Sequence, residues 1–312
     1  MKRYKKEQDG KLEVGQTLYT KNFALTVDRK LCKGCELCKL VCPREAITLV
    51  PAGDKDGKAV APSLDIDKDK CDFHGICAVV CPFSAISISV NGLNEAPAVM
   101  KEAFPKLERR IEIDTGQCEP GCKKCEESCP LGVITIERDR RGATSVNLLE
   151  EYYEGALIQV REEQNTSAVV HIRKELCAGC QICLMACPSD AIEVTKFIEG
   201  SIEIKGEACP DGCQRCLDVC PVNALAFDGN GKVYANNTYC VYCGACLQVC
   251  PAPDALKVER TVIRHTPIES GAWNRGLERM TSTAGLQREL AAGRAGKMRN
   301  ATRRLESPEV ED

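Results

Sequence analysis

The chain has 312 residues, a net charge of only −3 and no run of eighteen or more apolar residues. We therefore predict no transmembrane helix, and the near-neutral charge argues against a nucleic-acid-binding protein, which carries a strong basic excess. The composition is unusual because it combines 23 cysteines with only 4% aromatic residues.

The N-terminal residues, MKRYKKEQDGKL, contain no apolar segment of the kind found in secretory signals. We therefore expect a cytoplasmic protein in a reducing, anaerobic setting, where cysteines remain thiols or bind metal. Residues 1–19 contain no cysteine and are predicted to be an N-terminal extension.

The first cysteine motif lies between two β-like runs, FALTVD at 23–28 and AITLV at 46–50. Its spacing is CxxCxxCxxxCP, in which three closely spaced thiolates bind one iron–sulfur cluster and the fourth binds a second cluster. The motif comprises Cys32, Cys35, Cys38 and Cys42, followed by Pro43.

The second motif follows a turn signal at 53–57 (GDKDG) and precedes a β-like run at 85–90. It comprises Cys71, His74, Cys77 and Cys81, followed by Pro82, so a histidine stands where a cysteine is expected. An imidazole ligand in place of a thiolate removes one negative charge and is expected to raise the reduction potential, as in Rieske centres. The alternatives are a [3Fe-4S] cluster that His74 does not bind and a four-iron cluster with a solvent ligand.

The third and fourth motifs are flanked by β-like runs at 110–114, 133–137, 168–172 and 191–194. The third motif has one extra residue in its first gap. The predicted ligands are Cys118, Cys122, Cys125 and Cys129 in the third motif and Cys177, Cys180, Cys183 and Cys187 in the fourth.

Two further stretches lengthen the gaps between motifs. Residues 93–109 are predicted to be an insertion, and residues 146–165 mix apolar and acidic positions in a way that fits a helix. For both stretches we keep two interpretations, a docking element and a solvated insertion.

The fifth and sixth motifs are followed by β-like runs at 224–227 and 255–258, with a turn signal, DGNG, at 228–231. Their predicted ligands are Cys209, Cys213, Cys216 and Cys220 in the fifth motif and Cys240, Cys243, Cys246 and Cys250 in the sixth.

No cysteine follows the sixth motif, and residues 263–312 are predicted to be a basic arm that contains the only tryptophan, Trp273. We expect this arm to order against a partner subunit, with a disordered tail as the alternative. The other two histidines, His171 and His265, have no metal-ligand spacing and are predicted to be ordinary surface residues.

Disulfides and structural zinc explain these motifs poorly. A disulfide framework is typical of short secreted chains with an even number of cysteines, and zinc sites prefer two CxxC pairs separated by a longer spacer. Six four-ligand motifs instead predict six [4Fe-4S] clusters, with a [3Fe-4S] cluster as the alternative at the His74 site.

We therefore expect an α+β fold of three bacterial-type two-cluster ferredoxin modules in one chain, because each fourth cysteine needs a partner motif. The predicted modules span 20–92 with motifs one and two, 110–200 with motifs three and four, and 201–262 with motifs five and six. A nested order, in which the first motif pairs with the sixth, also fits the spacings.

No nucleotide-binding, nucleophile or metalloprotease motif is present. A protein whose clusters are fully ligated by its own side chains cannot bind substrate at them, so we predict one-electron transfer and no catalytic site. Six clusters exceed what a mobile carrier needs and suggest a wire with the clusters in a line.

The segments LCKGCELCKLVCPREAITL (31–49) and KCDFHGICAVVCPFSAI (70–86) resemble archaeal polyferredoxins, and most of all the polyferredoxin subunit of formylmethanofuran dehydrogenase. The resemblance covers residues 20–262. The chain departs from that family in having six motifs where eight are common, and in His74.

This resemblance implies that the cysteines are cluster ligands and that the chain conducts low-potential electrons to a tungsten- or molybdenum-pterin subunit that reduces carbon dioxide in methanogenesis. The implied electron donor is ferredoxin or a heterodisulfide reductase. The pattern also resembles the polyferredoxins of hydrogenase and heterodisulfide reductase complexes. A soluble electron carrier or reservoir is the third possibility.

Overall fold

The computed structural model describes residues 2–51, 53–94, 96–119, 121–139, 156–163 and 166–282. A short helix contains the third cysteine of each motif and ends one or two residues before the fourth. A proline follows that fourth cysteine and cannot donate a backbone hydrogen bond, so the helix does not continue. The helices are α1 (Leu37–Val41), α2 (Ile76–Val80), α4 (Lys124–Ser128), α5 (Ile182–Ala186), α6 (Arg215–Asp218) and the 3-10 helix η5 (Ala245–Gln248).

The strand that precedes an odd-numbered motif pairs antiparallel with the strand that follows the next motif. These pairs are β3 (Asn22–Asp28) with β8 (Ile86–Val90), β9 (Arg110–Ile113) with β13 (Ile192–Thr195), and β14 (Ile198–Ile204) with β17 (Leu256–Ile263). Each such pair encloses two consecutive motifs in one unit.

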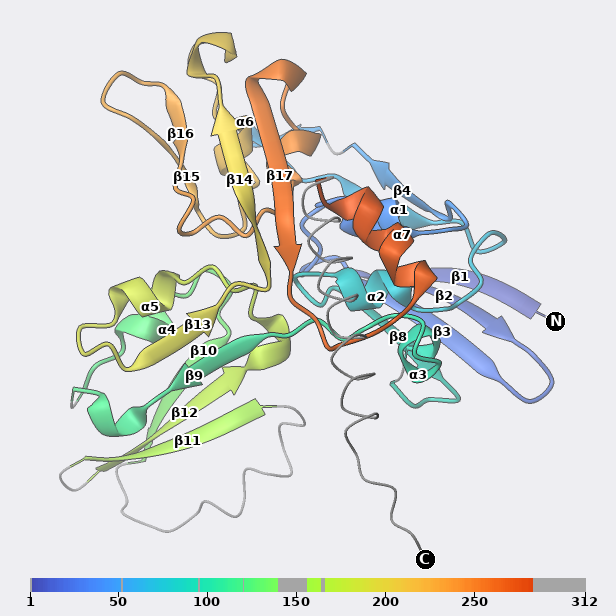
Figure 1. Ribbon diagram of the computed structural model, residues 1–312, viewed down its shortest axis with the longest axis horizontal. Coiled ribbons are helices and arrows are strands. Elements are labelled where there is room, and N and C mark those ends of the chain that lie inside the picture. Colours follow the sequence, from blue (N-terminus) through green and yellow to red (C-terminus); the bar gives the residue numbers. More distant parts are fainter. Residues whose placement is uncertain are drawn as a thin grey trace, which may run out of the picture.

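A second pair of strands lies inside each unit, between its two motifs. These pairs are β4 (Ile47–Val50) with β7 (Ser63–Ile66), β10 (Ile134–Asp139) with β12 (Thr166–Arg173), and β15 (Leu225–Phe227) with β16 (Val233–Ala235). The chain therefore forms three α+β modules, each built on two consecutive motifs, and this is the tandem order (Figure 1). We call them modules 1, 2 and 3 in chain order.

The N-terminal residues form a hairpin that extends the sheet of module 1. Strand β1 (Lys2–Gln8) pairs with β2 (Lys11–Thr17), and β2 pairs with β3, which gives the order β1-β2-β3-β8. The turn is Asp9-Gly10 with both residues at positive φ, as a tight hairpin requires. Leu12 and Val14 point into the core and are buried.

The other described elements are short or lie between the modules. They are β5 (Asp54–Lys55), β6 (Lys58–Ala59), α3 (Pro97–Met100), η1 (Thr115–Gln117), β11 (Ala156–Glu163), η3 (Lys174–Leu176), η4 (Gly206–Ala208), η6 (Pro253–Ala255) and α7 (Gly271–Met280).

The structure corrects the prediction of a helix in residues 146–165. Ala156–Glu163 form strand β11, which pairs antiparallel with β12 at the edge of a three-stranded sheet. A stretch that mixes apolar and charged residues can form a strand as well as a helix, and pairing with β12 decided between them. The remaining residues of that stretch, 146–155 and 164–165, lie outside the described ranges.

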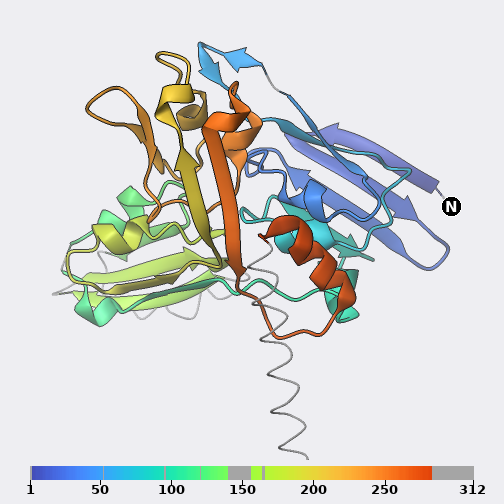
Figure 2. The ribbon, with the colours of Figure 1, turned by 45° about the horizontal axis from the view of Figure 1, so that its top comes forward.

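The C-terminal arm packs on its own chain within the described residues. Helix α7 lies against α1 (Figure 2), and Trp273, Leu277 and Met280 are buried in a core that also contains Leu37 and Val41. The Ser270 hydroxyl caps the helix by accepting hydrogen bonds from the amides of Ala272 and Trp273. Residues 283–312, on which the expected contact with a partner also rests, lie outside the described ranges.

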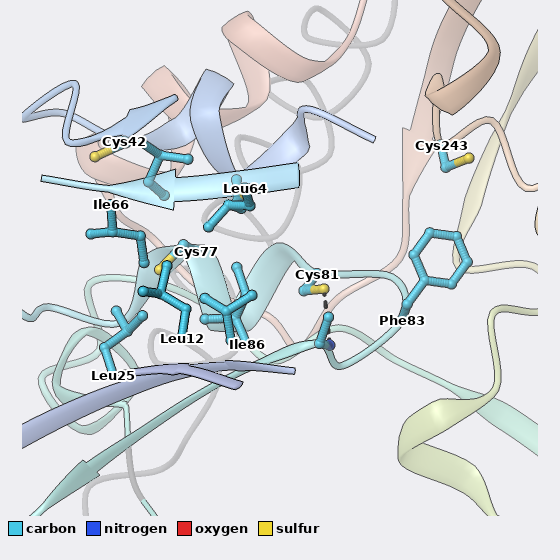
Figure 3. Close-up of a cluster of buried hydrophobic side chains, with 14 of the residues drawn as sticks. Leu12, Leu25, Cys42, Leu64, Ile66, Cys77, Cys81, Phe83, Ile86 and Cys243 are labelled. Carbon is cyan, nitrogen blue, oxygen red and sulfur yellow. Dashed lines mark hydrogen bonds between the residues drawn. The ribbon is translucent and has the colours of Figure 1, made fainter. Parts of the chain in front are cut away.

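The largest cluster of buried side chains contains residues from all three modules. Residues from module 1 (Phe83), module 2 (Ala178 and Cys180) and module 3 (Val241 and Cys243) belong to this one cluster of buried side chains. Figure 3 shows Phe83 extending from the Cys81 side toward Cys243. Among the described residues, no helix combines the length and the apolar character that a membrane span needs.

Replacing Trp273 with alanine is expected to lower the free energy of unfolding by about 3–5 kcal/mol, because a fully buried aromatic side chain leaves a large cavity. The indole also stacks edge-on against Phe104 and donates a 3.0 Å hydrogen bond to His265. Anaerobic chemical denaturation of the iron-loaded protein measures the loss. The exposed Leu93 provides the control, since Leu93→Ala should change stability by about 0.5 kcal/mol or less. Equal effects of the two substitutions would contradict this account of α7.

Candidate cluster-binding sites

Two left-handed residues shape the loop of four of the motifs. The residues on either side of the second ligand position have positive φ, as at Gly34 and Glu36 around Cys35. The same pair of conformations surrounds Cys180 and Cys243. Motifs three and five contain the extra residue, and there the residue after the second cysteine has a negative φ, −127° at Lys123 and −120° at Gln214.

The backbone around His74 follows the same pattern. Phe73 has a φ of 56° and Gly75 a φ of 79°, so His74 takes the place that a cysteine takes in the three related loops. A side chain at Gly75 would also meet Ile88 at 2.9 Å, and this close approach requires glycine.

In module 1 the fourth cysteine of each motif lies beside the first three ligand positions of the other motif. Cys32, Cys35 and Cys38 line one small hollow together with Cys81, and we call this group site 1. Cys71, His74 and Cys77 line a second small hollow together with Cys42, and we call this group site 2.

Modules 2 and 3 repeat the exchange. Cys177, Cys180 and Cys183 line a small hollow with Cys129 (site 4). Cys118, Cys122 and Cys125 act electrostatically on one another and form site 3, to which we assign Cys187 by analogy with the exchange in module 1, since it lies in the same apolar core. In module 3 the thiols that act electrostatically on one another define two groups. Site 5 contains Cys209, Cys213, Cys216 and Cys250, and site 6 contains Cys240, Cys243, Cys246 and Cys220.

Burial makes these thiols poor acids until a metal binds. Burial, followed by the charges of neighbouring thiols, raises the pKa of Cys183 to about 12, and the pKa of Cys243 to about 12. Burial and then the neighbouring Cys71 and Cys42 raise the pKa of Cys77 further. A buried thiolate therefore needs positive charge beside it, which iron supplies.

Backbone amides point at the fourth cysteine of several motifs. The amides of Ala46, Ala85, Val133 and Ala224 each donate to the sulfur four residues earlier, at 3.2–3.4 Å. Hydrogen bonds to ligand sulfurs stabilise the more negative, reduced state of a cluster. Grouped thiols around an enclosed hollow, with amides aimed at the sulfurs, fit an iron–sulfur cluster.

The hydrogen bonding of His74 indicates which ring nitrogen carries the proton. Its Nδ1 accepts a 3.3 Å hydrogen bond from the amide of Ile76, so the neutral ring is protonated at the buried Nε2, 3.1 Å from Asp72 Oδ1, and iron ligation through Nε2 would require the other tautomer. Burial lowers the pKa of His74, against the opposing effect of Asp72, and this favours the neutral imidazole that a metal needs. The role of His74 as a ligand remains a prediction.

The six sites do not lie in a line. The modules meet at sites 1, 4 and 6. Arg109 donates to the carbonyls of Cys81 in site 1 and Cys177 in site 4, and burial, followed by the charge of Cys243 in site 6, raises the pKa of Cys35 in site 1. The shared core also contains Cys71 and Cys77 of site 2. Module 1 meets module 2 through the hydroxyl of Ser84, which donates to the carbonyl of Glu175. We call sites 1, 4 and 6 the inner sites and sites 2, 3 and 5 the outer sites. The expected linear wire is therefore replaced by three arms that meet at the inner sites.

The prediction that His171 and His265 are ordinary surface residues is wrong. His171 is buried on strand β12, with Glu137 3.5 Å from its Nε2. His265 accepts the hydrogen bond from Trp273. Sequence reasoning also missed three basic residues at the module boundaries, Arg109, Lys196 and Arg260, because none of them belongs to a motif.

A family model described as a 4Fe-4S dicluster domain matches residues 31–85, 117–191 and 208–253. Each matched range contains two consecutive motifs. Among curated proteins, the polyferredoxin protein MvhB of Methanothermobacter marburgensis is 32% identical over 111 residues, which are 32% of this chain and 25% of that protein. A component of an ion-translocating oxidoreductase complex from Shewanella sediminis is 33% identical over 84 residues, 26% of this chain and 44% of that protein. The matches thus span less than half of either relative.

One solved structure is similar over nearly the whole chain. It is a chain of the formate dehydrogenase–heterodisulfide reductase–formylmethanofuran dehydrogenase complex from Methanospirillum hungatei, with a TM-score of 0.74 and 30% sequence identity. The similarity covers 90% of this chain and 92% of that one.

Paired substitutions distinguish the tandem grouping from the nested one. Because Cys42 and Cys71 line the same hollow, the double variant Cys42→Ala/Cys71→Ala should lose a single cluster, about four irons. The matched double variant Cys42→Ala/Cys35→Ala removes ligands from two sites and should lose two clusters. Iron and sulfide analysis of anaerobically purified protein measures both losses. If the first variant loses two clusters, Cys42 belongs elsewhere and the grouping is incorrect.

Replacing His74 with cysteine is expected to lower the reduction potential of the cluster at site 2, because a thiolate adds a negative charge that the neutral imidazole lacks. An EPR-monitored redox titration measures the potential, and His74→Ala, which removes the ligand, should reduce the iron content at this site. An EPR signal of an oxidised three-iron cluster in the unmodified protein would argue against imidazole ligation.

Proposed function

This chain belongs to the 4Fe-4S dicluster domain family, and from this premise we propose that it is the polyferredoxin subunit of a formylmethanofuran dehydrogenase assembly. In this role it conducts low-potential electrons to a tungsten- or molybdenum-pterin subunit that reduces carbon dioxide. The donor is ferredoxin or a heterodisulfide reductase. The chain has no catalytic site of its own in this proposal.

The observation that carries this proposal is the extent of the structural similarity. A dicluster motif is common to many redox proteins, but here the similarity extends over 90% of this chain and 92% of a chain in a complex named for formylmethanofuran dehydrogenase. Such coverage includes the order of the modules and the segments between them, which a shared motif does not require. Sequence identity of 30% over the same length supports a related role.

Bound clusters supply one-electron transfer, and the chain's own residues decide where each cluster is held and how far water reaches. The 23 cysteines and His74 provide the ligand positions, and at the inner sites Cys38, Cys180 and Cys243 are buried. Burial of these ligands limits the contact of water with the clusters and so lowers the reorganisation energy of electron transfer.

The three arms differ in their exposure. Cys118 and Cys122 of site 3 and Cys209 of site 5 are partly exposed, whereas Cys71 and Cys77 of site 2 are buried. The N-terminal hairpin contributes Leu12 and Val14 to the core that contains Cys42 and Cys77 of site 2. Figure 3 shows Leu12 beside Cys77. We infer that partner proteins exchange electrons at the ends of modules 2 and 3, and that site 2 is a closed side arm.

A second candidate function keeps the chemistry but changes the partners. The similarity to the polyferredoxin protein MvhB over 111 residues favours a role in a hydrogenase or heterodisulfide reductase complex as the alternative. A free electron carrier is the third possibility. It is favoured less, because the packed N-terminal hairpin and helix α7 are additions that a mobile carrier does not need.

Purification of the native assembly under anaerobic conditions tests the proposal. We expect the chain to copurify with large subunits that contain tungsten or molybdenum, in a complex that reduces carbon dioxide with electrons from reduced ferredoxin. Metal analysis and mass spectrometry identify those subunits. A hydrogenase in the complex would favour the second candidate, and an isolated monomer would favour the free carrier.

A further inference from the structure

Three basic side chains lie at the three boundaries between the modules, one at each boundary. They are Arg109, Lys196 and Arg260. Each donates hydrogen bonds to the backbone carbonyl of at least one cysteine in an inner site. They come from segments far apart in the sequence, so only the tertiary structure brings them to the centre.

Arg109 joins module 1 to module 2. Its guanidinium donates 2.7 Å hydrogen bonds to the carbonyls of Cys81 and Pro82 in module 1, and another 2.7 Å bond to the carbonyl of Cys177 in module 2. The guanidinium carbon also lies 4.6 Å from the centre of the Phe197 ring. Arg109 is therefore held on both sides of the boundary between sites 1 and 4.

Arg260 lies between module 3 and module 1. It is 8% exposed, and it donates to the carbonyls of Tyr242 and Cys243 in the loop of site 6, at 2.7 and 2.8 Å. A third hydrogen bond, to the carbonyl of Met280, reaches the end of helix α7. Across the boundary, Cys35 of site 1 is the thiol that acts on Arg260 most strongly.

Lys196 lies between module 2 and module 3. Its ammonium donates a 2.8 Å hydrogen bond to the carbonyl of Cys240 in site 6 and lies 5.0 Å from the centre of the Tyr242 ring. It also donates to the carbonyl of Asn237. On the other side, Cys180 of site 4 acts on its charge.

Cysteine thiols act on the charges of these three cations more strongly than carboxylates do. Burial lowers the pKa of Arg109 and that of Arg260, while cysteine thiols oppose this shift more strongly than the carboxylates of Glu175 and Glu36. Within the described part of the chain, no carboxylate forms an ion pair with any of the three. Burying a cation without an anion is costly, and carbonyl dipoles offset only part of that cost. A cluster with its thiolate ligands is the anion that these positions are built to face.

We propose that Arg109, Lys196 and Arg260 are positioning residues that align the three inner sites and that, through their positive charge, raise the reduction potentials of the clusters held there. This rests on the proposed electron-transfer function. Reduction adds one negative charge to a cluster, and a buried cation stabilises the reduced form more than the oxidised one. Electrons that enter through any arm therefore reside preferentially on the clusters at the inner sites.

The experiment uses the full-length, iron-loaded protein without partners, so its outcome does not depend on which complex the chain joins. Arg260→Met removes the charge and retains much of the side chain's bulk, while Arg260→Lys retains the charge and loses the forked hydrogen bonds. Lys196→Met is the second charge-removing variant, because this partly exposed side chain makes only two hydrogen bonds to carbonyls. Lys232→Met is the control, since Lys232 is exposed and lies near Cys209 of an outer site.

EPR-monitored redox titration is the readout, with iron content as the check on assembly. At the potential where the affected step is half complete in the unmodified protein, Arg260→Met should lower the ratio of reduced to oxidised cluster about tenfold, a shift of about 59 mV for a one-electron couple. Arg260→Lys should restore most of this ratio, and Lys232→Met should leave the same step unchanged.

Two results would overturn the proposal. One is an unchanged titration of Arg260→Met or Lys196→Met at full iron content. The other is an equal shift in Arg260→Met and Arg260→Lys, which would assign the effect to lost hydrogen bonds and not to charge. If Arg260→Met loses iron, the titration of Lys196→Met decides, because charge removal there must also lower the ratio.

Discussion

The exchange of the fourth cysteine between the two motifs of a module is the constraint on which the rest of this structure depends. In module 1, Cys81 lies with the first motif and Cys42 with the second. The exchange requires the two short helices to lie side by side, and α1 and α2 do so, as do α4 and α5. The strands that enter and leave the module then meet as antiparallel pairs. Ligand geometry and β-pairing thus support the same fold.

The same exchange places many thiols in the interior, where an uncompensated charge destabilises the fold. Cys38, Cys77 and Cys243 are each less than 10% exposed and share the central core with leucine, isoleucine and valine side chains. Thiolates persist in such a setting only when iron, backbone amides or buried cations compensate their charge. Stability and redox chemistry are therefore coupled, because the groups that make up the core are also the groups that bind the clusters.

Packing of the three modules on one another changes the interpretation of the chain. Six motifs in sequence suggest a line, but contacts between the modules bring sites 1, 4 and 6 together, and each module has one further site. The N-terminal hairpin adds apolar side chains beside site 2, while the cysteines of sites 3 and 5 remain partly exposed. Such an arrangement branches at the boundaries between the modules, which a line does not.

The sequence by itself determined the local structure around each motif and predicted the ligand positions. The spacing of each motif predicts its loop and helix, and β-like runs such as 23–28 and 85–90 became β3 and β8, since these features depend on residues close in the chain. Residues 156–163 were misread because their pattern fits a helix and a strand equally, and only pairing with β12 separates the two. The convergence of the inner sites, and the placement of Arg109, Lys196 and Arg260 between them, was decided by tertiary structure alone. These contacts join residues from three modules, and no short-range pattern in a single sequence encodes them.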